Sequence, residues 1–145
     1  MAIRCEIVSQ DRIVYSGDAD IVVLPGADGF MGILPNHAPV LTVLRYGIIT
    51  VRSKGEEQLF TVAGGVAEVQ PDQVTILADA AENIAEIDIR RAEEAKRRAE
   101  EMLSKEPTNT DQYLAIQSAL RKSTLRIDAV RRYRERTRQR PSSSN

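Results

Sequence analysis

The residues of this chain best suited to chemistry lie in one short segment, "IDIRRA", at positions 87–92. The segment places one carboxylate, Asp88, ahead of two adjacent arginines, Arg90 and Arg91. A helix N-terminus already carries partial positive charge, so each cation there is disfavoured by about 0.3–1 kcal/mol. Either the arginines are solvated while Asp88 caps the helix, or they bind an anion.

Other chemical motifs are missing from the sequence. There is no CxxC, no HExxH and no Gly-x-x-x-x-Gly-Lys-Ser/Thr phosphate loop. The only histidine, His37, has no cysteine or second histidine beside it to complete a metal site. The single cysteine, Cys5, excludes an internal disulfide and is expected to be a small buried hydrophobe. The pair Gly64-Gly65 is interpreted as a tight turn between two strands. We therefore predict a non-catalytic chain that binds no metal.

Composition and charge divide the chain into two parts. Its 145 residues, 42% hydrophobic and 28% charged, suit one globular domain or a small domain with an appendage. Residues 1–80 contain 5 basic and 10 acidic residues, whereas residues 81–145 contain 15 and 11. From Arg121 onward there are 9 basic residues and 2 acidic ones, which predicts an acidic partner for this end. We expect no membrane span and no targeting segment.

The first part has the pattern of β-structure. Short apolar segments recur at 3–9, 19–26, 47–53, 58–64, 65–70 and 73–79. Between them lie turn signals at Ser16-Gly17-Asp18, Ser53-Lys54-Gly55 and Gln70-Pro71-Asp72. Many short strands without helical crossovers predict an antiparallel β-sandwich or flattened barrel, which we assign to residues 1–84.

The second part, residues 85–138, has helical periodicity. One apolar face comprises Ile87, Ala92, Ala95, Ala99, Met102 and Leu103. A second helix is expected to begin near Asn109, beyond Pro107, with a seam of Tyr113, Ile116, Leu120, Ser123, Ile127 and Val130. The two should form an antiparallel hairpin in which the small alanines allow close approach. Residues 139–145 are polar and are predicted to be disordered.

Three segments together resemble a known family: "GFMGILPNHAPVLTVLRYGIITVR", "VAGGVAEVQPDQVTILADAAE" and the charged two-helix region that follows. In this order the chain is similar, over about residues 1–135, to the epsilon subunit of bacterial F-type ATP synthase. The resemblance implies a sandwich that binds the gamma subunit and the c-subunit ring, and so completes the central stalk. It implies that catalysis takes place on the beta subunits, and that the helices inhibit ATP hydrolysis in the alpha/beta head. The expected location is the cytoplasmic face of the bacterial plasma membrane, as a peripheral protein.

The resemblance also suggests contact residues. On the sandwich these are Asp28, Phe30, Met31 and His37, toward the gamma subunit and the c-ring. On the helices a basic face of Arg121, Lys122, Arg126, Arg131 and Arg132 would meet an acidic segment of the beta subunit. Phe30 departs from the polar or acidic residue usual there, which suggests an apolar contact, unless the ring folds back onto the sandwich. The alternative for "GILPNHAP" is a proline-rigid turn that only shapes the sandwich, and the two are compatible.

The segment "IDIRRA" matches the Ile/Leu-Asp-x-x-Arg-Ala motif associated with ATP binding in some members of the family. By that resemblance the ATP-binding residues are Glu82, Ile87, Asp88, Arg91, Ala92, Arg98, Lys122 and Arg126. Lys122 departs from the arginine of the best-matching relatives, so it keeps the charge and loses the forked geometry. ATP would be a regulatory ligand of the folded hairpin, and no cofactor is required. The alternative remains that Asp88 is only a helix cap.

Two other functions are compatible with parts of the sequence. The basic segment "RRYRERTRQR" has the charge of a nucleic-acid or anionic-lipid binding module. A free-standing ligand-binding sandwich is the other alternative. Because the first rests on charge alone, we expect no nucleic-acid partner.

Overall fold

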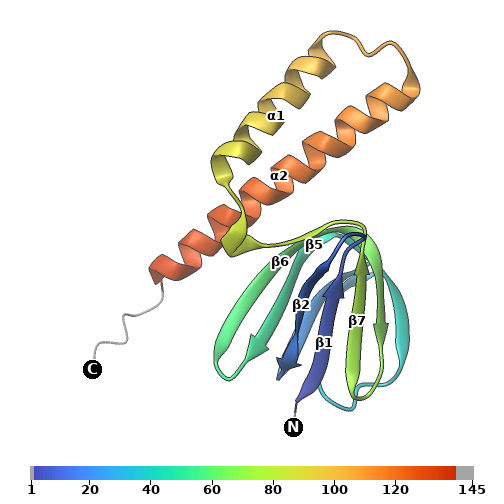
Figure 1. Cartoon of the computed structure of the whole chain (residues 1–145), viewed down its shortest axis with the longest axis vertical. Helices are drawn as coiled ribbons and strands as arrows, with labels where there is room; N and C mark the ends of the chain where they lie inside the picture. The colour runs from blue at the N-terminus through green and yellow to red at the C-terminus, as the bar shows by residue number, and fades with distance from the viewer. Residues whose placement is uncertain (1, 140–145) are drawn as a thin grey trace. The chain divides into compact units, whose positions relative to one another are not determined.

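The computed structural model describes residues 2–139 of the chain, and the side chains of all of these except Thr137 and Gln139. Eight strands come first: β1 (Ile3–Val8), β2 (Ile13–Ala19), β3 (Ile21–Gly26), β4 (Gly29–Ile33), β5 (Val40–Ser53), β6 (Glu56–Val69), β7 (Gln73–Ala78) and β8 (Ala81–Asn83). A 3-10 turn, η1 (Ile84–Glu86), leads to two helices, α1 (Ile89–Ser104) and α2 (Thr110–Gln139) (Figure 1). Except for Gln139, the predicted tail 139–145 lies outside the described residues.

The chain forms two compact units, which divide between Ile84 and Ala85. The first unit is a β-sandwich and the second is a helical hairpin, so the predicted fold class is confirmed. The sheet has the order β2-β1-β7-β6-β5-β3-β4, with β8 paired to β6. All of its pairs are antiparallel except β1 with β7, a parallel pair that the sequence reasoning did not anticipate.

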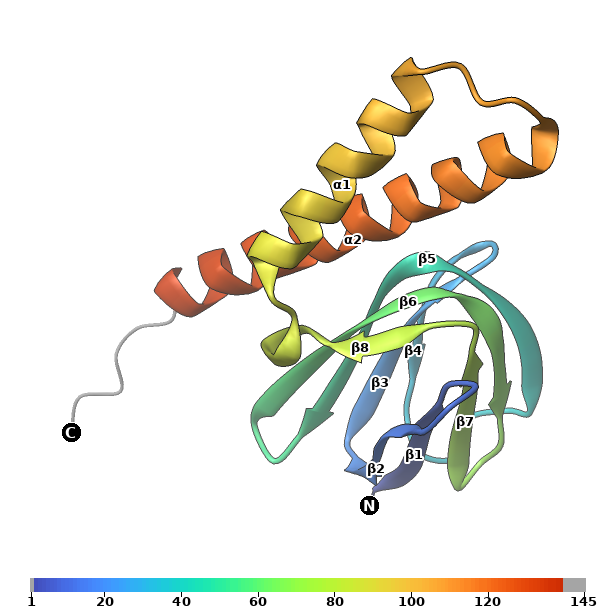
Figure 2. The same cartoon turned by 45° about the horizontal axis from the view of Figure 1, so that its top comes forward.

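The long strands β5 and β6 belong to both layers of the sandwich (Figure 2). The second half of β6 pairs with β7, and its first half pairs with β8. Between the two halves lie Gly64 and Gly65, both with positive φ. A Cβ on Gly65 would clash with the carbonyl oxygen of Leu77, so only glycine fits this bend. Strand alternation turns large apolar side chains such as Phe60, Ile7 and Leu24 into the space between the layers.

Two turn predictions in the sandwich were wrong. Gly64-Gly65 does not join separate strands but bends the single strand β6, because positive φ changes the direction of a strand without ending its pairing. Ser16-Gly17-Asp18 lies inside β2, where Gly17 pairs with Cys5 of β1. Turn-forming residue types lie within a strand here because cross-strand hydrogen bonds outweigh local preference. The other two turn signals were correct, since they separate β5 from β6 and β6 from β7.

The helices α1 and α2 run antiparallel, side by side, and both begin where the sequence predicted (Figures 1 and 2). The Asp88 carboxylate caps α1, and the Asn109 side chain accepts a 2.7 Å hydrogen bond from the Gln112 N–H at the start of α2. α1 ends at Ser104, before Pro107.

The seam between the helices consists largely of small and β-branched residues. Ala92 and Ala99 of α1 are buried, as are Ile116, Ser123, Ile127 and Val130 of α2. Two seam predictions were wrong: Met102 is 48% exposed and Tyr113 is 42% exposed. Both lie near the connection between the helices, at the margin of the apolar face, where little of the partner helix covers them. The alanines allow close helix packing but bury little apolar area.

Candidate functional site

The segment 87–92 forms the first turn of α1 and the residues just before it. One Asp88 oxygen, Oδ1, accepts hydrogen bonds from the backbone N–H groups of Arg90 at 3.0 Å and Arg91 at 3.4 Å. These bonds satisfy donors that have no partner inside the helix, which is the work of an N-cap. The cap predicted from the sequence is confirmed. Both arginine side chains are exposed.

The hairpin brings four predicted phosphate-binding cations to one side. At about 100° per residue, Arg91 and Arg98 lie roughly a quarter turn from the buried line through Ala92. Lys122 and Arg126 lie about as far, in the same rotational sense, from the buried seam of α2. When two helices pack antiparallel, residues displaced from the seam in the same rotational sense lie on the same side of the pair. The four cations therefore lie on one side of the hairpin.

Three of these cations also lie at a similar level along the hairpin. With a rise of 1.5 Å per residue, Arg91 lies about 20 Å from the connected end of α1. By the same measure, Lys122 and Arg126 lie about 18 and 24 Å from the start of α2. Arg98 lies about 10 Å nearer to the connection, one step along the same flank. The cations therefore form a row suited to an extended polyanion.

The surroundings of the four cations differ. Arg98 pairs with Glu94 at 3.0 Å, and Arg126 is half-buried. Within residues 2–139, the guanidinium of Arg91 and the ammonium of Lys122 have no ion pair or hydrogen bond. Two cations without an acidic partner on one flank are suited to an anionic ligand.

The other predicted ATP-binding residues are distributed over both units. Ile87 is half-buried just before α1, and Ala92 is fully buried in the seam, where its small side chain lets α2 approach. Glu82 belongs to β8 of the first unit, so the hairpin by itself supplies the remaining seven residues. No group of side chains among the described residues could hold a metal ion.

The predicted basic face of α2 is spread over three directions around the helix. α2 is an unbroken helix, so 100° steps place Lys122 and Arg126 beside the seam. Arg121 and Arg132 lie on the side away from the seam, and Arg131 lies on the flank of the seam opposite Lys122 and Arg126. The prediction that all five lie on one face was wrong, because it treated nearness in sequence as nearness on the helix surface. Lys122 and Arg126 are the two residues also assigned to the ATP site.

Three of the four sandwich residues predicted to contact the rotor, Asp28, Phe30 and Met31, lie along the hairpin of β3 and β4. Ala27 and Asp28 form its two-residue turn, and Gly26 pairs with Gly29. Phe30 and Met31 lie in β4 and not in the turn. The Phe30 ring is 78% exposed, so it does not fold back onto the sandwich. Met31 is half-buried and packs against the core.

His37 closes a tight turn after β4. Its backbone N–H donates to the carbonyl of Leu34 at 3.2 Å, and Asn36 between them has φ of +67°. Proline followed by a left-handed asparagine is typical of a type II turn. The Nδ1 atom of His37 donates to the carbonyl of Ala38 at 2.7 Å. The predicted proline-rigid turn is therefore present, and it holds the half-buried His37 ring in place.

One surface was missed by the sequence reasoning. Val8, Leu77, Val66 and Val43 are consecutive cross-strand partners in β1, β7, β6 and β5, and so share one outer face. Val43 and Leu77 are about 60% exposed, and Leu41, on the same face of β5, is 71% exposed. We call these five residues the apolar row. In the sequence, these strands carry apolar residues at positions that face both sides of the sheet. A search for strict alternation of apolar and polar residues overlooks that pattern.

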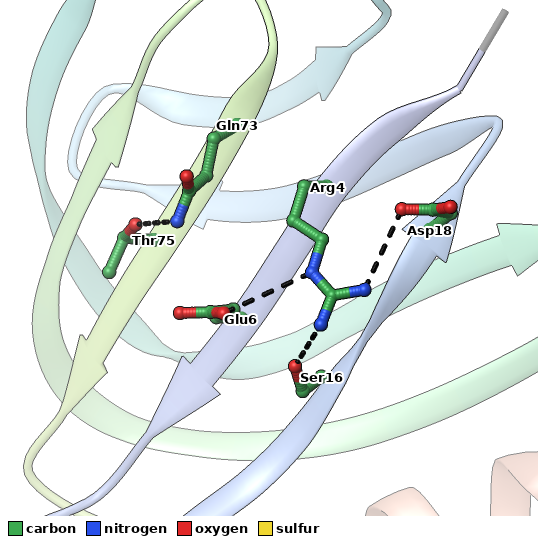
Figure 3. Close-up of polar contacts among 6 residues, drawn as sticks. All are labelled: Arg4, Glu6, Ser16, Asp18, Gln73 and Thr75. Atoms are coloured by element: carbon green, nitrogen blue, oxygen red, sulfur yellow. Dashed lines mark hydrogen bonds and ion pairs between the residues drawn. The ribbon is translucent and has the colours of Figure 1, made fainter.

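The same outer face becomes polar toward its other end. Arg4 donates from Nη2 to Ser16 Oγ at 2.7 Å, and its Nη1 lies 3.7 Å from Asp18 Oδ1 (Figure 3). Gln73 donates to Thr75 at 3.2 Å on the neighbouring strand (Figure 3). These polar side chains form hydrogen bonds and an ion pair with one another. The apolar row is the exposed part of the same outer face that has no such polar interactions, and it is therefore the part suited to contact another protein.

Comparison with known proteins covers both units. Residues 2–84 match the family model "ATP synthase, Delta/Epsilon chain, beta-sandwich domain", and residues 85–131 match the corresponding "long alpha-helix domain". The chain is 42% identical over 135 residues to the ATP synthase epsilon chain of Alkalilimnicola ehrlichii, covering 92% of this chain and 96% of that one. It is 49% identical over 102 residues to that of Pelotomaculum thermopropionicum, covering 70% and 76%.

Solved structures share the fold. A chain in the cryo-EM structure of the Euglena gracilis mitochondrial ATP synthase (OSCP/F1/c-ring) superimposes with a TM-score of 0.68 at 22% identity, covering 83% of this chain and 76% of that one. Neither helix in the described part of the chain has the length and apolar character needed to cross a bilayer.

Proposed function

The chain belongs to the ATP synthase delta/epsilon family of non-catalytic subunits, and from this premise we propose that it is a rotor component that regulates ATP hydrolysis. In this proposal the sandwich couples the central stalk to the c-ring, at the cytoplasmic face of the bacterial membrane. The helical hairpin inhibits hydrolysis in the catalytic head, and ATP controls the hairpin. The observation that carries the regulatory part is the row of four cations on one side of the helical hairpin.

The sandwich offers two apolar surfaces for coupling. The apolar row lies on the outer face of β1, β7, β6 and β5, and suits docking to the gamma subunit. Phe30 lies on β4, near the Ala27-Asp28 turn, and suits the c-ring. Apolar patches on a monomer commonly mark interfaces, and two separate ones suit a subunit held between two partners.

The folded hairpin is suited to bind ATP. Arg91 and Lys122 have no partner in the described part of the chain, and guanidinium groups bind phosphate through forked hydrogen bonds. ATP that binds only the folded form would stabilise it by about 2.7 kcal/mol at a hundredfold excess over the dissociation constant. That energy adds to what the apolar seam supplies, so ATP would shift the hairpin toward its closed form.

The inhibitory contact and the ATP site compete for the same residues. Lys122 and Arg126 belong to both predicted sets, and they lie on the seam flank of α2. A nucleotide on that flank would occupy them, so they could not reach an acidic segment of the beta subunit. ATP would therefore prevent inhibition both by closing the hairpin and by covering these cations.

Removal of the helices tests the inhibitory role. Asn83 pairs with Phe60 of β6 and Ile84 is only 2% exposed, so the truncated chain should end at Glu86 in order to keep the sandwich intact. ATP hydrolysis by the assembled complex is expected to rise with this chain, while assembly is unchanged. Equal hydrolysis with the full and the truncated chain would exclude inhibition by the hairpin. Loss of assembly would instead place coupling contacts on the helices.

A further inference from the structure

Strand β4 forms an open edge of the sandwich. In the described part of the chain it comes last in the sheet order and pairs only with β3. An edge strand presents a line of N–H and C=O groups to which another strand can bond, and proteins commonly protect such edges with charged residues or proline. Residues 29–34, "GFMGIL", contain neither. This edge is therefore free to accept a further strand.

The hydrogen bonds of β3 decide which peptide groups face that edge. The N–H of Ala27 donates to the carbonyl of Val43 in β5 at 2.9 Å, so the N–H and C=O of Gly26 point the other way, toward β4. Bonded positions recur at every second residue of an antiparallel strand, and on β4 they are the odd-numbered residues. The N–H and C=O groups of the even-numbered residues, Phe30 and Gly32, therefore point out of the open edge.

Phe30 and Gly32 also share the outer face of β4. Side chains alternate along a strand, and the intervening Met31 and the following Ile33 pack in or against the core. The exposed Phe30 ring thus lies on the same face as a residue that has no side chain. A two-fold axis at Met31 would place Phe30 of each copy opposite Gly32 of the other.

We propose that the free subunit forms a two-fold dimer in which β4 of one copy pairs antiparallel with β4 of the other, Phe30 opposite Gly32. This register uses the outward N–H and C=O groups of both residues in both copies. Each ring then covers the glycine across from it, as aromatic side chains do beside edge glycines. The charged Asp28 does not oppose this pairing, because its two copies lie about 20 Å apart along the strands.

The dimer is a form of the unassembled subunit. In the proposed function Phe30 contacts the c-ring, so the second copy and the rotor compete for the same edge. This competition rests on the proposed function, whereas the dimer itself does not.

Sedimentation equilibrium on the full-length chain tests the dimer with a matched pair of variants. Phe30→Glu should weaken self-association at least about tenfold, because it brings two carboxylates into the paired edge. Leu41→Glu changes a similarly exposed apolar residue in the apolar row and should leave self-association unchanged. A monomer at every concentration would overturn the proposal. Dissociation by Leu41→Glu and not by Phe30→Glu would also overturn it, and would place the contact on the apolar row.

Amide hydrogen exchange followed by NMR tests the register. As the dimer forms with rising concentration, the amides of Phe30 and Gly32 should exchange more slowly in proportion to the fraction of dimer. The amides of Met31 and Ile33 bond to β3 in monomer and dimer alike, so their exchange should stay the same. A dimer in which Phe30 and Gly32 show no protection would contradict pairing through β4.

Assembly of the complex with Phe30→Glu separates this inference from the proposed function. A variant that loses the dimer and still assembles with full coupling would support the dimer and count against the Phe30 contact with the c-ring alone. A variant that keeps the dimer and loses coupling would overturn the dimer proposal and support that contact.

Discussion

At the scale of single residues, the first turn of α1 combines a helix cap with a candidate anion-binding residue. Asp88 uses one carboxylate oxygen to cap the helix, which leaves the adjacent arginine side chains extended into solvent. Arg90 and Arg91 differ only in direction: Arg91 lies on the flank with Lys122, and Arg90 points about 100° away from it. The same cap thus presents one arginine to the candidate site and the other to solvent.

This difference provides a matched test of ATP binding. In calorimetry on the full-length chain, Arg91→Ala should weaken ATP binding about ten- to a hundredfold, because a hydrogen bond to a charged group contributes about 1.5–3 kcal/mol. Arg90→Ala should leave binding unchanged, since both variants keep the backbone N–H groups that Asp88 accepts. Absence of heat and of a thermal shift at millimolar ATP in the unchanged chain would leave Asp88 as a cap only.

Cys5 is fully buried between the layers of the sandwich. Burial, with a smaller contribution from Glu6, raises the pKa of its thiol from 9.0 to about 12, against an opposing effect of Arg4. Above pH 9 the unfolded chain loses this proton while the folded chain retains it. The folded state should therefore lose stability between pH 9 and 12, by up to about 1.4 kcal/mol per pH unit.

Urea unfolding across that pH range measures the effect, with Cys5→Ala as the control. The alanine variant should lack the part of the slope that begins near pH 9. It keeps the later contribution of Tyr15, whose pKa burial also raises above 10.0. An identical slope in both chains would mean that the thiol does not ionise on unfolding in this range.

At the scale of elements, β6 serves both layers of the sandwich because it bends at Gly64 and Gly65. Gly65→Ala should destabilise the fold by about 3 kcal/mol, since the added Cβ meets the Leu77 carbonyl at a backbone angle alanine avoids. Gly55→Ala is the matched control: its φ is +81°, nothing lies within 4 Å, and strain alone should cost about 1 kcal/mol. Equal urea midpoints for the two variants would contradict the close approach.

At the scale of the whole molecule, the two units are built from separate sets of buried residues. Every member of the main core cluster lies between Ile3 and Ala81, so no helix residue contributes to it. The chain that ends at Glu86 should therefore keep a cooperative thermal transition within a few degrees of that of the full chain. A chain that ends at Ala80, which removes β8 and the buried Ile84, should melt lower. Loss of the transition in the first chain would show that the sandwich needs the helices.

The sequence by itself determined the fold class and both helix starts. Each depends on residues near one another in the chain: alternation in β1, the carboxylate of Asp88 ahead of its helix, and Asn109 three residues before Gln112. Such signals are local in origin, so periodicity and residue type are sufficient to read them.

Only the tertiary structure decided which residues meet across the chain. From the sequence alone, Gly65 is interpreted as a turn residue. Only the pairing of β6 with both β7 and β8 shows that it is a bend within one strand. The apolar row exists because four strands set Val43, Val66 and Leu77 side by side. Likewise, Lys122 joins Arg91 because α2 returns antiparallel to α1. These contacts depend on register and direction between distant segments, which local pattern does not specify.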